Sequence, residues 1–267
     1  MIESFIFIFG CIVGSFLNVC IVRMPHERSI VKPASHCPRC KKPIAWYDNV
    51  PLVSYLVLGG KCRHCKAPFS FRYFIVETLT GIVFLLFYFY YGMNILIVPY
   101  LFMTCCFIVA TFVDFAHRII PDEVSVGGMI AGLIFSLCIP EMHRILPSYP
   151  FYLAHVKSLG LSLLGVLVGG GSIYAMGMLG DFLFKKESMG GGDVKLLAMI
   201  GAFLGWEAAI LTFFIAPVFG AVFGIIEKIR TKDSTIAYGP FLIVGALISL
   251  FFKDRILELL FRNYGLY

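Results

Sequence analysis

Apolar runs alternate with short polar segments along almost the whole chain. The runs cover residues 2–22, 74–91, 95–113, 124–139, 159–179, 194–204, 208–226 and 236–252. A helix needs about 20 apolar residues to cross the hydrocarbon core of a bilayer, so most runs are long enough and the sixth is marginal. The pattern predicts an all-α polytopic integral membrane protein with about eight transmembrane helices.

Composition supports the same class. Apolar residues make up 59% of the chain and charged residues 14%, with a mean hydropathy of +0.88, which lies outside the usual range of soluble domains. An acid, Glu3, lies at the start of the first run and Arg23 follows the run, the reverse of a cleavable signal, so we expect this run to be a retained span.

The basic residues are distributed unevenly among the predicted loops. Of the 22 Lys and Arg residues, five lie in the segments predicted to be outside, which leaves 17 inside. The outside five are Arg144, Lys157, Lys253, Arg255 and Arg262. By the positive-inside rule both termini are outside, and the positive charge reflects membrane topology rather than a nucleic-acid partner.

Residues 23–73 form the longest polar segment and contain six prolines without sustained helical periodicity. We therefore expect a small, turn-rich cytoplasmic domain here. The chain divides into a first transmembrane helix at 1–22, a four-cysteine zinc-binding domain at 23–73 and a multi-span membrane domain at 74–267.

Two Cys-x-x-Cys pairs, Cys37 with Cys40 and Cys62 with Cys65, flank 21 residues of the polar segment. This spacing is typical of zinc ribbons, in which two tight turns hold one tetrahedral ion, and four thiolates leave zinc no open position. The pattern predicts a structural zinc site. A redox-active thiol pair is the alternative, and His36 and His64 are neighbours rather than required ligands.

Two carboxylates mark the boundaries of apolar runs. Asp114 ends the third run, and Asp193 follows Gly190, Gly191 and Gly192 directly before the sixth. Acids at a membrane boundary are costly and indicate function, although Asp193 alone could cap a helix. The topology places both acids on the cytoplasmic face. If they converge, they match an aspartic protease, in which two carboxylates share a proton and activate water.

Other polar residues allow two interpretations each. Asn18 and Glu77 lie in or near apolar spans, and Glu77 either helps to bind a ligand or pairs with Arg72. Asp122 is expected to be a turn or cap acid rather than a third catalytic group. Lys195 either stabilises the charge of Asp193 or extends to the membrane surface.

Together these motifs resemble the bacterial prepilin peptidases, also called type IV leader peptidases, which are membrane aspartic proteases with a Gly-x-Gly-Asp motif. The similarity covers most of the chain. It includes residues 14–19, the double Cys-x-x-Cys domain, 72–81, 114–122 and 190–195. By motif, the catalytic acids of the family fall on Asp114 and Asp193, with Gly190, Gly192 and Lys195 as supporting positions.

The resemblance implies an inner-membrane enzyme that removes the leader of type IV prepilins and type II secretion pseudopilins at the cytoplasmic face. It also implies N-methylation of the new terminus with S-adenosylmethionine. As a polar residue near an apolar span, Glu77 is a candidate for binding either the methyl donor or the substrate terminus. No strand and glycine-rich turn of a soluble methyltransferase is present. The alternatives are a non-enzymatic scaffold of a secretion or pilus machine and a membrane thiol oxidoreductase.

Overall fold

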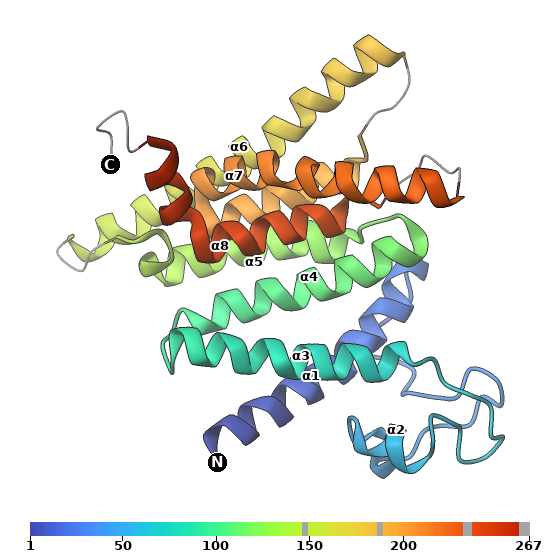
Figure 1. Ribbon diagram of the computed structural model, residues 1–267. Coiled ribbons are helices and arrows are strands. Elements are labelled where there is room, and N and C mark those ends of the chain that lie inside the picture. The colour runs from blue at the N-terminus through green and yellow to red at the C-terminus, as the bar shows by residue number, and fades with distance from the viewer. Residues whose placement is uncertain (146–148, 186–188, 232–236, 262–267) are drawn as a thin grey trace. The chain divides into compact units, whose positions relative to one another are not determined.

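In the part of the chain that the structure describes, the regular elements are helices (Figure 1). The computed structural model describes residues 1–145, 149–185, 189–231 and 237–261, so Lys186, Lys232 and Arg262, which entered the charge count, lie outside the described residues. The chain separates into two compact units, Met1–Val113 and Asp114–Tyr267. Each unit has its own candidate site.

The first unit is built on close packing of α1 (Ile2–Arg23) against α3 (Arg72–Tyr91). Glycines make this approach possible: a Cβ built on Gly10 would lie 2.8 Å from the Gly81 Cα, and one built on Gly14 would lie 2.8 Å from the Glu77 Cα. Small residues let helix backbones touch in this way. The polar segment between the helices contains only short elements, which are η1 (Met24–His26), η2 (Trp46–Asn49) and α2 (Val53–Val57).

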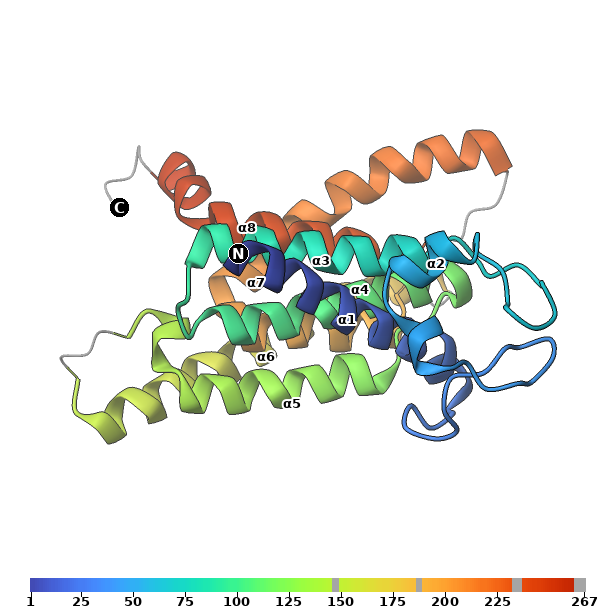
Figure 2. The same ribbon diagram turned by 90° about the horizontal axis from the view of Figure 1, so that it is seen from below.

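The second unit gathers α5 (Asp122–Cys138), α6 (Phe151–Phe184), α7 (Gly191–Thr231) and α8 (Gly239–Phe261) into one bundle, with η3 (Pro140–His143) between α5 and α6 (Figures 1 and 2). Buried hydroxyl groups connect the helices. The Ser162 hydroxyl donates to the Ala202 carbonyl at 2.7 Å, which satisfies a polar group that has no access to water.

α7 doubles back on itself at Gly205, whose φ of 81° is outside the helical range. A Cβ built on Gly169 would meet both Leu197 and Ala209. In a continuous helix these two residues would be about 18 Å apart, so the chain must reverse between them. The two predicted runs at 194–204 and 208–226 are thus the two arms of a helical hairpin.

Five helical stretches in the described residues are long and apolar enough to cross a membrane. They are Ile2–His26, Arg72–Tyr91, Ile97–His117, Phe151–Leu183 and Gly191–Gly224. The helical class is confirmed, whereas eight transmembrane helices are not. α5 is only 17 residues long, and α8 carries Lys253, Asp254 and Arg255.

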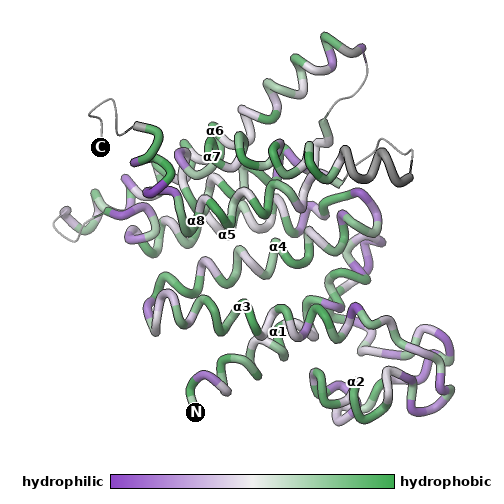
Figure 3. Tube along the Cα trace, in the orientation of Figure 1, coloured by the Kyte–Doolittle hydropathy of each residue, from purple (hydrophilic) through white to green (hydrophobic). Residues whose placement is uncertain are grey.

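The hydropathy of the helices suits a lipid environment, and that of the polar segment suits contact with water. Hydrophilic residues gather in the loops around α2 (Figure 3). Large apolar side chains stay exposed on the helices, among them Leu86, Phe89, Leu167 and Phe214. Exposed apolar surface on this scale indicates contact with a membrane.

Two helix boundaries differ from the sequence prediction in ways that affect the acids. α4 (Ile97–His117) continues past the apolar run, so Asp114 lies inside its last turn rather than after the helix. α8 begins at Gly239, three residues later than the predicted run. These boundaries bring the Gly239 amide within hydrogen-bond distance of the Asp114 carboxylate.

The contact between α6 and α7 yields a stability prediction. A Cβ built on Gly165 would overlap the carbonyl group of Gly201, whereas one built on Gly171 in the same helix would meet nothing within 4 Å. We expect Gly165→Ala to cost about 1–3 kcal/mol of stability through overpacking and to lower the midpoint of thermal unfolding in detergent.

The matched control is Gly171→Ala, which should leave that midpoint unchanged or raise it, because alanine favours a helix by about 1 kcal/mol over glycine. Equal midpoints for the two variants would contradict the close backbone contact.

Candidate functional site

The four cysteines of the polar segment converge in the first unit. Their sulfur atoms all lie within 4.8 Å of one another. The Cys37 and Cys65 sulfurs are 3.8 Å apart, and those of Cys40 and Cys62 are 3.9 Å apart. A tetrahedral zinc ion with bonds of about 2.3 Å to sulfur separates its ligands by about 3.8 Å, so the cluster fits zinc.

Two nearly identical turns present these sulfurs. The Cys37 amide donates to the Lys42 carbonyl at 3.0 Å, and the Cys62 amide donates to the Ala67 carbonyl at 2.8 Å. In each turn a lysine, Lys41 or Lys66, adopts positive φ. An isolated β-bridge closes each turn, His36 with Pro43 and Lys61 with Pro68. The pairing of two matched turns is typical of zinc ribbons.

Backbone N–H groups favour the thiolate form at two of the four cysteines, Cys37 and Cys62. Backbone N–H groups of Cys65 and His64 point at the Cys62 sulfur and lower the pKa of its thiol to about 7. The backbone of Cys40 likewise lowers the pKa of the Cys37 thiol. Lower pKa values increase the thiolate fraction, which is the form that binds zinc. At Cys65 the hydrogen bond from the Ala67 backbone is outweighed by burial and the neighbouring thiols, which raise the pKa of that thiol to about 11. His36 is held elsewhere, with its Nδ1 at 3.0 Å from the Ala34 carbonyl.

Asp114 lies in the second unit and is 5% exposed. Its Oδ2 accepts a hydrogen bond from the Gly239 amide at 3.0 Å. The charge of Arg118 acts on the same carboxylate. A buried carboxylate requires such partners, and here the first residue of α8 supplies one.

Asp193 is the third residue of α7 and is partly buried. Its amide donates to the Gly190 carbonyl at 3.1 Å, and a Cβ built on Gly190 would lie 3.2 Å from its Oδ2. The triple glycine therefore forms a tight turn that delivers the carboxylate at the start of the helix. Glycine suits this turn because a side chain at Gly190 would crowd the acid.

Ile120 connects the surroundings of the two acids. A Cβ built on Gly192 would lie 3.3 Å from the Ile120 Cβ, and one built on Gly239 would lie 3.1 Å from its Cδ1 and 2.8 Å from the Asp114 Oδ2. The residue before Asp193 and the amide partner of Asp114 thus contact one side chain. The two carboxylates are close enough for their charges to interact.

Neighbouring charged residues have other partners. The Lys195 ammonium group forms an ion pair with Asp122 at 2.7 Å, and both side chains are exposed. Asp122 is the first residue of α5, after the N-cap residue Pro121, and an acid in the first turn of a helix is favoured by the helix dipole. Lys195 thus pairs with Asp122 in place of the suggested pairing with Asp193.

Glu77 and Asn18 lie in the first unit, and both are buried. The Glu77 Oε2 accepts a hydrogen bond from the Leu52 amide at 2.8 Å. The pairing with Arg72, which the sequence left open, is not the contact that forms, because the Arg72 guanidinium lies over the Tyr73 ring at 5.7 Å. The Asn18 Nδ2 donates to the Tyr73 carbonyl at 3.1 Å.

Gly239 and Ile120 are site residues that sequence reasoning did not identify. The only local sign was a Gly-Pro pair, Gly239 with Pro240, near the start of the last apolar run. A backbone donor leaves no mark in residue type, since every residue except proline carries one.

Comparisons with known proteins agree over nearly the whole chain. The family model described as Bacterial Peptidase A24 N-terminal domain matches residues 8–91, and the model described as Type IV leader peptidase family matches residues 101–225. No solved structure matches the chain.

Curated relatives carry one name, prepilin leader peptidase/N-methyltransferase. The chain is 38% identical to the one from Myxococcus xanthus (strain DK1622) over 85% of this chain and 63% of that protein, so it spans less than two thirds of that relative. It is 30% identical to the one from Aeromonas hydrophila over 98% of this chain and 94% of the relative. It is 32% identical to the one from Neisseria gonorrhoeae over 93% of this chain and 90% of the relative.

The cysteine cluster predicts stoichiometric metal. We expect elemental analysis of the purified protein to find about one zinc ion per chain, and Cys62→Ser to abolish it, because three thiolates do not complete the site. Cys138→Ser removes an exposed cysteine outside the cluster and should retain the zinc. A metal-free wild type with a disulfide between Cys37 and Cys40 would support the redox alternative instead.

Proposed function

Because the chain belongs to the type IV leader peptidase family, we propose that it is a membrane aspartic endopeptidase that cleaves the leader of type IV prepilins and type II secretion pseudopilins. We also propose that it N-methylates the new amino terminus, as the names of its relatives indicate. Asp114 and Asp193 are the proposed catalytic residues of the cleavage.

The observation that carries this proposal is the common environment of the two acids. They come from chain segments 79 residues apart, by subtraction of their numbers, yet both lie next to residues that contact Ile120. Their charges interact, and the charge of Asp193 also acts on Tyr238, the residue before Gly239. Placing two carboxylates close together is unfavourable because like charges repel, so their proximity supports a joint function.

The proposed mechanism uses the pair as one acid and one base. Two adjacent carboxylates share a proton and titrate together. The ionised carboxylate takes a proton from a water molecule, which attacks the scissile carbonyl. The protonated carboxylate donates to the carbonyl oxygen and later to the leaving amine. The Gly239 amide holds the Asp114 carboxylate in place during these transfers.

Zinc and the methyl donor have separate proposed roles. Cys37, Cys40, Cys62 and Cys65 would hold a structural zinc ion that fixes the polar segment. S-adenosylmethionine, when bound, would supply an activated methyl group for the new amino terminus. Glu77 is our candidate for contacting this donor.

We further propose that the arms of α7, together with α5 and α8, complete an eight-span topology in a bacterial inner membrane. The excess of Lys and Arg in alternate loops supports an orientation with both termini outside. The polar segment and both acids then face the cytoplasm. A cytoplasmic site suits a substrate whose basic leader stays on that side. Lipid is therefore a partner of the helices.

A scaffold of a secretion machine and a thiol oxidoreductase remain the competing functions. Neither accounts for a buried carboxylate that is held by an amide from a distant helix. The thiol interpretation is also disfavoured by four sulfurs in one cluster, since a redox pair needs two. Loss of cleavage in folded acid variants distinguishes a protease from a scaffold.

Substitution of either acid tests the mechanism. We expect Asp114→Asn and Asp193→Asn each to reduce cleavage of a synthetic prepilin by at least about 100-fold, because an amide cannot exchange the proton. Asp122→Asn is the matched control and should keep substantial activity, since Asp122 pairs with Lys195 on the surface. Full activity in either site variant would remove that acid from the mechanism.

The contact between Gly239 and Asp114 predicts a second, weaker effect. Gly239→Ala places a methyl group against the Asp114 Oδ2 and should displace the carboxylate, which we expect to reduce kcat for leader cleavage by about 10- to 100-fold. Gly127→Ala, in open space, is the control. An unchanged kcat for Gly239→Ala would show that the position of Asp114 does not depend on this contact.

A further inference from the structure

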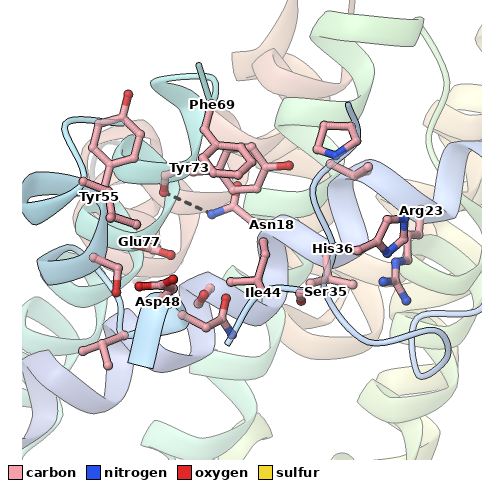
Figure 4. Close-up of a pocket in the computed structure, with 18 of the residues that line it drawn as sticks. Asn18, Arg23, Ser35, His36, Ile44, Asp48, Tyr55, Phe69, Tyr73 and Glu77 are labelled. Carbon is pink, nitrogen blue, oxygen red and sulfur yellow. Dashed lines mark hydrogen bonds between the residues drawn. The ribbon is translucent and has the colours of Figure 1, made fainter. Parts of the chain in front are cut away.

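A cavity of about 450 Å³ lies within the first unit, between α1, α3 and the polar segment that joins them (Figure 4). Its volume is in the range of small-molecule sites in proteins. All of its lining residues fall between Ser15 and Glu77, so the cavity is separate from Asp114 and Asp193.

An unpartnered acceptor lies in the wall of this cavity. Asn18 is 1% exposed, and its Nδ2 donates to the Tyr73 carbonyl (Figure 4). Because a carbonyl only accepts, this bond fixes the orientation of the amide, and the Oδ1 is left buried without a hydrogen bond. A buried acceptor without a hydrogen bond destabilises the protein, and a ligand with an N–H donor would remove that cost.

Glu77 adds a carboxylate to the same wall (Figure 4). Glu77 is 7% exposed and accepts a hydrogen bond from the Leu52 amide. Leu52 makes this bond with a φ of 58° and a ψ of −50°. In the described residues no ion pair neutralises this carboxylate. The charged form of a buried acid is stabilised by an opposite charge, so the wall favours a cationic ligand.

The remaining lining is aromatic and basic. Tyr55, Phe69 and Tyr73 supply ring surface, on which a flat base or a cation can pack. Arg28 and Lys41 line the cavity as exposed cations and suit a carboxylate. A ligand that fits all of these groups carries a positive charge, an aromatic base and a carboxylate.

We propose that this cavity binds the methyl donor, that Glu77 is the counter-ion of its sulfonium group, and that the Asn18 Oδ1 accepts one of its N–H groups. This inference rests on the proposed N-methyltransferase function and assigns that function a place and a recognition chemistry. It concerns binding and does not require the peptidase acids.

The counter-ion role has a consequence for release of the product. Methyl transfer forms a bond from the substrate nitrogen to the methyl carbon, breaks the carbon–sulfur bond with its electron pair left on sulfur, and releases one proton from nitrogen. The sulfur is then neutral. Glu77 therefore holds the cationic donor more tightly than the spent product, which favours release of the product.

The test measures binding rather than turnover. Calorimetry on the purified full-length protein gives the Kd for S-adenosylmethionine and for S-adenosylhomocysteine, with no prepilin present. We expect Glu77→Gln to weaken binding of the cationic donor about tenfold, which corresponds to about 1.4 kcal/mol. Binding of the neutral product should weaken about twofold or less, because it carries no positive charge on sulfur. Glu27→Gln, an exposed acid outside the cavity, should change neither.

Asn18→Ala is the second variant, and its thermal unfolding is measured alongside. It should weaken both ligands alike, because the lost acceptor does not sense the charge on sulfur. If Glu77→Gln weakens binding of both ligands equally, the counter-ion role is wrong. If both variants bind both ligands as the wild type does, this cavity is not the binding site. A wild type that cleaves prepilin but binds neither ligand would refute the methyltransferase part of the proposed function itself.

Discussion

The hydrogen bond from the Gly239 amide to the Asp114 carboxylate organises the second unit. A carboxylate buried at the end of an apolar helix is stable only if polar groups replace the water that it has lost. The first amide of α8 does this at 3.0 Å. Gly239 must approach so closely that any Cβ would collide with the acid.

This constraint extends to Asp193 through packing. The same glycine that reaches Asp114 contacts Ile120, and Ile120 also meets Gly192, next to the second acid. The reversal of α7 at Gly205 returns the chain toward α8, so that three helix termini meet at one place. The positions of the two acids therefore rest on close contacts between helices. The first unit follows the same logic, with glycines in α1 and α3 bringing Asn18 and Glu77 to one cavity wall.

The sequence predicted the features that depend on residue type and spacing. Apolar runs indicated the helices because length and hydropathy decide what can lie in a bilayer, and the reversal at Gly205 had appeared as a gap between two runs. The cysteine spacing indicated the four-cysteine cluster for a similarly local reason. Asp114 and Asp193 stood out because charges are rare in such runs.

What the sequence left undecided depends on tertiary contacts. The Gly239 donor is a backbone group, and the unpaired Asn18 Oδ1 follows from where the Tyr73 carbonyl lies. Pairings of charged groups were equally undetermined: the exposed Lys195 forms an ion pair with Asp122, and the buried Glu77 accepts a hydrogen bond from the Leu52 amide and does not pair with Arg72. Each outcome requires knowledge of which helix faces which.

The central claim is that Asp114 and Asp193 lie close together, and thiol crosslinking tests it most directly. Asp114→Cys combined with Asp193→Cys should be joined by a short bifunctional thiol reagent, identified by mass spectrometry of the linked peptides, because both positions adjoin residues that contact Ile120. Asp114→Cys combined with Asp254→Cys is the control, since Asp254 lies about 22 Å along α8 from Gly239. Rapid crosslinking of the first pair alone is the predicted result, and failure of that pair to crosslink in folded protein would contradict the account.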